Sequence, residues 1–337
     1  MAATRNINLD IIRGIAAFSV VANHVLSHFE GFQGSIIGNI NFSLQNPLFM
    51  MVSGFALVYS KPILNREACF NYIKKRTIQL LLPWLIWSLL QFVLFSKESF
   101  FEHIAYTANH MEGAYWFLFS IWVMSMIYAL SSWLFHKIVE TKLRYIIAVS
   151  VSCMFLVSTL TVVSFLTVGI DFLAIKFTAY YFPFYLLGWY VAEAMKIQWS
   201  VKVKKLFSAF ICFALISYII LIAKVDMASV PDKYALIRII TSLMGCMVLF
   251  QSVFTWEFNP QNSFVRIINW GGVHSLELYV VHYVTMHFLK PSSTSITTIN
   301  GFLEFLGYFA IVLVCTALII EVINTNKKSR FILFGKN

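Results

Sequence analysis

Residues 8–25, NLDIIRGIAAFSVVANHV, have the length and the apolar character of a helix that crosses a lipid bilayer. Similar apolar runs of about twenty residues recur from one end of the 337-residue chain to the other. The chain is 59% hydrophobic and only 12% charged, and its mean hydropathy is +0.77. A soluble domain would have about 25% charged residues. The sequence therefore predicts an all-α, polytopic integral membrane protein.

The distribution of basic residues predicts about ten transmembrane helices with both termini in the cytoplasm. Of the 25 Lys and Arg residues, 18 fall in segments that this topology places inside and 6 in segments that it places outside, while Arg13 lies within the first span. Because the outer loops are short and no internal repeat is visible, we expect a single transmembrane domain over residues 1–337. The expected spans fall near residues 8–28, 37–60, 77–96, 115–135, 145–165, 178–195, 206–223, 236–256, 271–290 and 301–323.

The net charge of +10 is explained by the basic cytoplasmic loops, so it does not indicate a polyanionic partner. No basic stripe accompanies a recognition element, and nucleic acid is therefore not an expected partner. The five cysteines are scattered and form no Cys-x-x-Cys pair, so the sequence predicts neither a disulfide framework nor a zinc site. The composition itself predicts membrane lipids as partners, and it gives no oligomeric state.

Arg13 and His24 are ionisable residues near opposite ends of the first apolar span. They are eleven residues apart, which places them on one face of an α-helix and about 16 Å apart along its axis. Because an ionisable group in a membrane helix usually faces a cavity or a partner, both are candidates to line one groove, with Arg13 nearer the cytoplasm. The alternative is that each side chain snorkels to its nearer membrane interface.

His28 follows His24 by four residues, a spacing at which two histidines can bind one metal ion. No glutamate follows His24 as it does in the H-E-x-x-H motif, and no third ligand is evident nearby. We therefore expect no metal, and a metal-dependent hydrolase is the weaker interpretation of this pair.

Polar groups also occur in and just before the next two spans. In FMMVSGF (49–55), Ser53 and its glycine neighbour serve either close helix packing or the close approach of a ligand. The basic residues Lys74, Lys75 and Arg76 precede the third span, as the positive-inside rule requires, but Arg76 is also suited to bidentate phosphate contact.

The ninth span contains a stripe of polar residues within GGVHSLELYVVH (271–282). Ser275, Tyr279 and His282 are spaced by four and three residues, so they share one helix face. Mere packing is a poor explanation for such a stripe in a lipid-crossing helix. We expect these three side chains to line a polar cavity.

Taken in order, these segments resemble the motifs of the membrane acyltransferase 3 family. The family opens with a helix of the pattern LDxLRGIAAxxVxxxH, which corresponds here to LDIIRGIAAFSVVANH. The family's FxxSGF, WFL, YFxFxxxG and GxxSLxxYxxH segments correspond in order to FMMVSGF, the WFL at 116–118, YYFPFYLLG at 180–188 and GGVHSLELYVVH. The resemblance therefore extends over most of the chain.

The resemblance implies a donor, acetyl-coenzyme A, in the cytoplasm and an acceptor hydroxyl on the outer side. It implies that His24 acts as the general base on the acceptor hydroxyl or, in a variant, carries the acyl group itself. Arg13 and Arg76 would hold the donor phosphates. The family usually has a second arginine three residues after the first, but this chain has Gln79 there. The role of that second arginine is then either unfilled or taken by Lys74 or Lys75.

The resemblance also implies roles for the remaining polar residues as a group. Ser53, Tyr279 and His282 are candidates to orient the base or to stabilise the oxyanion. Trp116 and Ser275 lie in matching motifs and are expected to contact the substrate. The resemblance does not assign one role to each of the first three residues.

The function implied is O-acetylation of a bacterial surface polysaccharide by an enzyme of the cytoplasmic (inner) membrane. The acceptor would be a lipid-linked or surface glycan, with the O-antigen of lipopolysaccharide as the first expectation. The alternative from another class is a transporter or flippase for lipid-linked sugars, which would also need polar groups among about ten helices. Such a protein would not need the Arg–His pair or the Ser–Tyr–His stripe.

Overall fold

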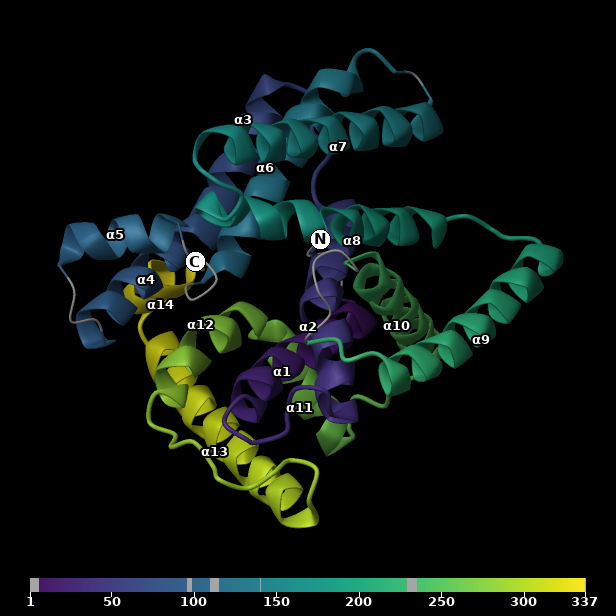
Figure 1. Ribbon diagram of the computed structural model, residues 1–337. Coiled ribbons are helices and arrows are strands. Elements are labelled where there is room, and N and C mark those ends of the chain that lie inside the picture. Colours follow the sequence, from purple (N-terminus) through teal and green to yellow (C-terminus); the bar gives the residue numbers. More distant parts are fainter. Residues whose placement is uncertain (1–5, 96–98, 110–114, 140, 229–234, 337) are drawn as a thin grey trace. The chain divides into compact units, whose positions relative to one another are not determined.

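The computed structural model describes residues 6–95, 99–109, 115–139, 141–228 and 235–336, and most of these residues are helical (Figure 1). Among them there is no strand, only an isolated bridge between Glu30 and Ser295. The all-α prediction is confirmed. The α-helices are α1 (Ile7–Leu26), α2 (Ile36–Phe55), α3 (Arg66–Arg76), α4 (Leu82–Phe95), α5 (Phe100–Asn109), α6 (Trp116–His136), α7 (Lys142–Thr167), α8 (Ile175–Ala194), α9 (Val201–Lys224), α10 (Ala235–Thr255), α11 (Ser263–Val273), α12 (Ser275–Met286), α13 (Ile299–Asn324) and α14 (Lys327–Phe334).

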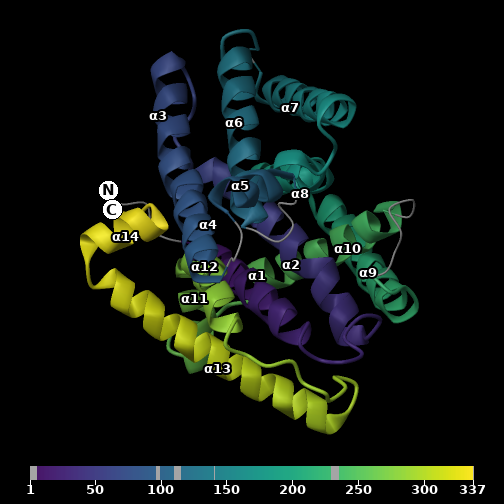
Figure 2. The ribbon, with the colours of Figure 1, turned by 60° about the vertical axis from the view of Figure 1, so that its left-hand side comes forward.

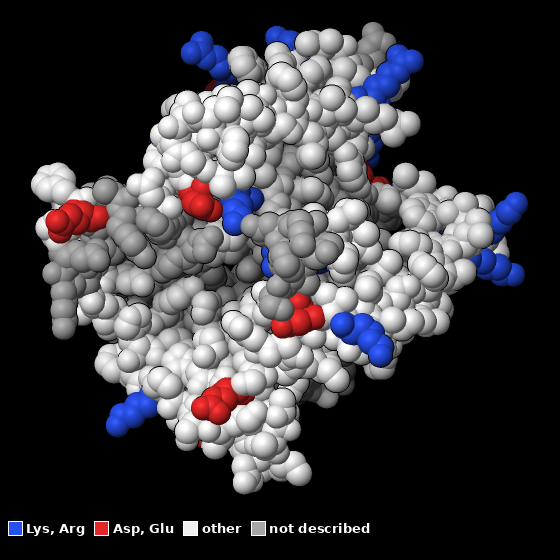
Figure 3. Space-filling view, viewed as in Figure 1, with Lys and Arg blue, Asp and Glu red and all other residues white. Residues whose placement is uncertain are grey.

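Eight helical segments of the described chain are long and apolar enough to cross a membrane. They confirm a polytopic membrane protein, and uncharged side chains cover most of the face shown in Figure 3, as contact with lipid requires. The 20-residue α8 is not among the eight, although a span was expected near 178–195.

The ninth expected span differs from the structure, because residues 271–290 do not form one helix. α11 ends at Val273 and α12 begins at Ser275, and His274 between them has non-helical backbone angles (φ −105°, ψ 24°). Gly271 and Gly272 precede this break, and glycine has low helix propensity. Apolar residues lie on both sides of the break, which is why hydropathy predicts one span.

The chain divides into two compact units. Unit 1 comprises Met1–Val52 and Val191–Val322, and unit 2 comprises Ser53–Tyr190 and Ile323–Asn337. Unit 1 therefore contains α1 and α9–α12 in full, whereas unit 2 contains α3–α7 and α14.

In unit 1, α1 packs against α11 and α12, and Figures 1 and 2 both show these three helices side by side. Glycines make the approach of α1 and α11 possible: a Cβ at Gly14 would clash with the backbone oxygen of Ile268, and a Cβ at Gly272 with that of Asp10. Since backbone atoms cannot give way as flexible side chains can, these two contacts fix α1 against α11.

The far end of α1 is tied to the loop that follows α12. The backbone N–H of Ser292 donates to the oxygen of His28 (2.8 Å), and that of Ile296 to the oxygen of Glu30 (3.0 Å). The ends of α1 and α12 are therefore held together by main-chain hydrogen bonds as well as by packing.

Replacing Gly272 with alanine is expected to destabilise the protein by about 1–3 kcal/mol, because the added methyl group forces α1 and α11 apart. Gly307→Ala is the matched control, since a Cβ at Gly307 in α13 meets no atom within 4 Å. Alanine there should be neutral or stabilising by about 0.5–1 kcal/mol. Thermal unfolding of both variants in detergent measures the difference. Equal melting temperatures for the two variants would contradict the close approach of α1 and α11.

In unit 2, a π-helical turn at Thr77–Leu81 joins α3 to α4. It lies just before Pro83, which has no N–H to donate and so disturbs the helical hydrogen-bond ladder at this point. The indole of Trp122 in α6 donates to the Thr77 hydroxyl (3.0 Å), and the indole of Trp87 in α4 donates to the backbone oxygen of Leu333 in α14 (2.8 Å). These contacts hold α6 and α14 against the α3–α4 segment.

Candidate active site

His24 lies in the last turn of α1, where it meets two aromatic side chains of α12. Its ring centroid is 5.2 Å from that of His282 and 4.6 Å from that of Tyr283. The two histidines lie 258 positions apart in the sequence, and the packing of α1 on α12 brings them together in unit 1. We call His24, His282 and Tyr283 the histidine cluster.

Tyr283 holds the ring of His24 in place, because its hydroxyl lies 3.0 Å from Nε2 of His24. The hydroxyl can accept a hydrogen bond from a protonated Nε2 or donate one to an unprotonated Nε2. Tyr283 is not among the residues that the sequence singles out. Its position four residues after Tyr279, next to His282, was the available signal.

His282 is fully buried, and the hydrogen bond of its Nδ1 determines its tautomer. Nδ1 lies 2.8 Å from the backbone oxygen of Leu278. Because a carbonyl oxygen only accepts, Nδ1 must carry the proton, and in neutral His282 the other nitrogen, Nε2, has a free lone pair. That Nε2 is buried without a hydrogen-bond partner among the described residues. This nitrogen can accept a hydrogen bond from a donor group of a bound ligand.

The other two residues of the expected stripe also lie on α12. Tyr279 is buried, and its ring centroid is 6.2 Å from that of His282. Ser275 is the first residue of α12 and is half-buried. The structure thus brings Tyr279 to the histidine cluster, whereas Ser275 lies at the opposite end of the same short helix.

Arg13 forms an ion pair within α1. Its Nη1 lies 3.4 Å from Oδ1 of Asp10, one turn earlier. The Asp10 side chain is only 3% exposed, whereas that of Arg13 is 28% exposed. A buried carboxylate is costly unless it is paired, so Arg13 has a structural task. Asp10 was not among the expected site residues, although its spacing of three residues from Arg13 is typical of a helical ion pair.

The basic residues expected to hold the donor phosphates lie in the last turn of α3 in unit 2. Lys74 and Lys75 are exposed, and Arg76 is half-buried with its guanidinium carbon 5.3 Å from the centroid of the Tyr72 ring. Arg76 is therefore oriented by its surroundings, whereas the two lysines extend into solvent.

Ser53 and Trp116 also belong to unit 2. Ser53 is half-buried near the end of α2. A Cβ on its neighbour Gly54 would clash with the backbone oxygen of Tyr185 in α8, so this glycine serves close helix packing. Trp116 begins α6 and stacks on Phe177, with ring centroids 4.4 Å apart.

Comparison with known proteins identifies the family of the chain. A family model described as Acyltransferase domain matches residues 6–321. The chain belongs to the acyltransferase 3 family. The expectation from the five ordered motifs is confirmed.

Two curated relatives of this acyltransferase 3 protein share one name, Nodulation protein NolL. Nodulation protein NolL of Mesorhizobium japonicum is 26% identical over 231 residues, which cover 62% of this chain and 56% of that protein. Nodulation protein NolL of Sinorhizobium fredii is 27% identical over 229 residues, covering 63% of this chain and 56% of that protein. The chain thus spans about half the length of the curated relatives that it matches. No solved structure matches it.

In this acyltransferase 3 protein, the surroundings of His24 and His28 do not resemble a metal site. Nδ1 of His28 lies 3.0 Å from the backbone oxygen of His24, so the His28 ring is engaged with the main chain of α1. Within the described part of the chain, no group of three His, Cys, Asp or Glu residues is placed to hold a metal ion.

Proposed function

We propose that the chain is a membrane O-acyltransferase that moves an acetyl group from acetyl-coenzyme A to a hydroxyl of an extracytoplasmic glycan. The observation that supports this most is the histidine cluster, which places two imidazoles and a phenol together between α1 and α12 of an acyltransferase 3 protein. A neutral imidazole is the side chain best suited to accept a proton from a sugar hydroxyl near neutral pH.

In this proposal His24 is the general base, and Tyr283 selects its tautomer. Nε2 of His24 faces Tyr283, which leaves Nδ1 for the acceptor hydroxyl. For Nδ1 to accept a proton, Nε2 must already carry one and donate it to the Tyr283 oxygen. Nδ1 takes the hydroxyl proton as the sugar oxygen attacks the thioester carbonyl. The resulting imidazolium returns this proton to the departing thiolate, so no net charge is left on the protein.

His282 has a different role from that of an oxyanion donor. Since its Nδ1–H is committed to the backbone oxygen of Leu278, neutral His282 has no second N–H to give to an oxyanion. It accepts a hydrogen bond instead, which suits it to orient a hydroxyl of the acceptor. Tyr279, buried next to it, remains the candidate donor to the oxyanion in unit 1.

The donor phosphates are assigned to Arg76, assisted by Lys74 and Lys75, at the end of α3. A guanidinium binds phosphate through two parallel hydrogen bonds, and lysines add charge without fixed geometry. Arg13 is proposed to contribute positive potential near the donor while it remains paired with Asp10. Trp116 and Ser275 are proposed to contact the substrate, and Ser53 to supply a hydroxyl near it.

The proposed setting is the bacterial inner membrane, with acetyl-coenzyme A on the cytoplasmic side and a lipid-linked or surface glycan on the other. The O-antigen of lipopolysaccharide is the proposed acceptor. Eight apolar helices in the described part of the chain support the membrane setting. The excess of basic residues in the predicted cytoplasmic loops supports the orientation.

The test is acyl transfer by the purified full-length chain in proteoliposomes. Radiolabelled acetyl-coenzyme A is supplied on one side, and lipid-linked O-antigen on the other. We expect label in the glycan, released by mild alkali as an ester should be, and none when either substrate is omitted. Movement of the lipid-linked glycan across the bilayer without incorporation of label would instead indicate a flippase. Mass spectrometry of surface glycans with and without the gene then identifies the acetylated sugar.

A further inference from the structure

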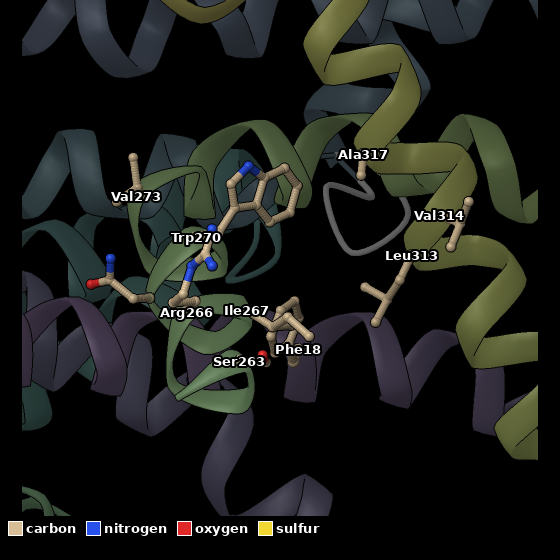
Figure 4. Close-up of a pocket in the computed structure, with 10 residues that line it drawn as sticks. Phe18, Ser263, Arg266, Ile267, Trp270, Val273, Leu313, Val314 and Ala317 are labelled. Atoms are coloured by element: carbon tan, nitrogen blue, oxygen red, sulfur yellow. The ribbon is translucent and has the colours of Figure 1, made fainter. Parts of the chain in front are cut away.

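A groove of about 660 Å³ lies between α11 and α13 in unit 1, away from the side chains of the histidine cluster. Its floor and one wall are apolar: Phe18 comes from α1, and Leu313, Val314 and Ala317 come from α13. Figure 4 shows these α13 side chains across from Arg266 and Trp270 of α11. The groove therefore has an apolar side and a side with one cation.

Among the described residues that line the groove, Arg266 is the only ionisable one. It is exposed, and no carboxylate lies within ion-pair distance of it in the described part of the chain. The acidic residue that approaches α11 from α13 is Glu321, and its Oε1 accepts a hydrogen bond from the Trp270 indole at 3.3 Å. Arg266 is thus left with its charge available to a ligand.

The groove is bordered by a helix that faces the bilayer, so a membrane lipid is the ligand that can reach it most directly. α13 is 26 residues long and among the most apolar spans of the protein, and Val314 and Leu318 are exposed to the extent of 59% and 62%. Side chains exposed in the middle of such a helix face the bilayer. A lipid can therefore enter the groove sideways, with its acyl chains on Leu313 and Val314.

We propose that this groove binds one anionic phospholipid, with its phosphate on Arg266 and its acyl chains along the apolar wall formed by α13. The charge of Arg266 complements the phosphate, and a guanidinium is suited to bidentate contact with it. A zwitterionic lipid brings its own ammonium group, which competes with Arg266 for the phosphate. A basic residue in a pocket between transmembrane helices is a known basis for selecting anionic headgroups.

Native mass spectrometry of the full-length protein in non-ionic detergent tests this site directly. Phosphatidylglycerol and phosphatidylcholine with identical acyl chains are titrated separately. We expect phosphatidylglycerol to bind more tightly, and Arg266→Gln to weaken its binding about fivefold while leaving phosphatidylcholine unchanged. Arg144→Gln is the matched control, because Arg144 is an exposed arginine of α7 that does not line the groove.

A second variant tests the apolar wall of the groove and leaves the charge of Arg266 unchanged. Ala317→Trp fills the groove from α13 and should weaken the binding of both lipids. The proposal is overturned if Arg266→Gln weakens phosphatidylglycerol no more than Arg144→Gln does, or if the wild type binds both lipids equally. It is also overturned if acetyl-coenzyme A displaces the bound lipid, since the groove would then belong to the acyl donor. None of these readouts requires acyl transfer.

Discussion

His24→Ala should lower kcat for acyl transfer by roughly 10²–10⁴-fold, the usual contribution of a positioned general base. The reason is geometric: His24 is the residue of α1 that reaches both His282 and Tyr283, and alanine leaves no group on α1 to accept the hydroxyl proton. Purified protein at matched concentration, with saturating acetyl-coenzyme A, gives the measurement. His136→Ala, at the end of α6, is the control for loss of a histidine elsewhere.

Tyr283→Phe separates the proton chemistry of His24 from its packing, because it keeps the ring and removes only the hydroxyl. If Tyr283 selects the tautomer, this variant should lose kcat by about tenfold with little change in KM, whereas Tyr190→Phe should be unaffected. Normal turnover by His24→Ala would exclude His24 as the base. Normal turnover by Tyr283→Phe alone would leave His24 as the base but remove the role given to the tyrosine.

The sequence is sufficient to predict which residues of this site share a helix. The helix that contains Arg13 and His24, and the single helix face that contains Tyr279 and His282, follow from apolar length and residue spacing. These are properties of one helix at a time, so a pattern within about twenty residues is sufficient to predict them. The family motifs add an order to these segments, but not their positions in space.

What the sequence could not supply is the pairing of helices. The contact of His24 with His282 depends on α1 packing against α12, and this depends on glycines that lie near the other end of α1. The break at His274 is likewise hidden, because apolar residues continue on both sides of it. Tyr283 was missed because a tyrosine near the end of a membrane helix is common, and only its contact with His24 in space distinguishes it from the others.

Some predicted assignments still rest on the sequence. Arg76, Lys74, Lys75, Ser53 and Trp116 all belong to unit 2, whereas the histidine cluster belongs to unit 1. Their roles toward the donor and the substrate therefore stay predictions. They can be tested residue by residue through the KM for acetyl-coenzyme A.

Arg13→Ala should destabilise the protein by about 3 kcal/mol, because it removes the positive charge that faces the buried Asp10 carboxylate. The loss alone would not distinguish a structural arginine from one that binds the donor, so the informative variant is the double replacement Asp10→Asn with Arg13→Gln. It removes both charges, so no buried charge is left without its counter-charge, and it should recover most of the stability lost by Arg13→Ala.

The activity of the double variant then measures the contribution of Arg13 to donor binding separately from its contribution to stability. If Arg13 contributes positive potential to donor binding, the KM for acetyl-coenzyme A should remain raised several-fold in a protein that melts almost like the wild type. Recovery of both stability and KM would limit Arg13 to neutralising Asp10. Failure to recover stability would contradict the ion pair itself, because removing both members of a pair that only neutralises two charges leaves no buried charge without its counter-charge.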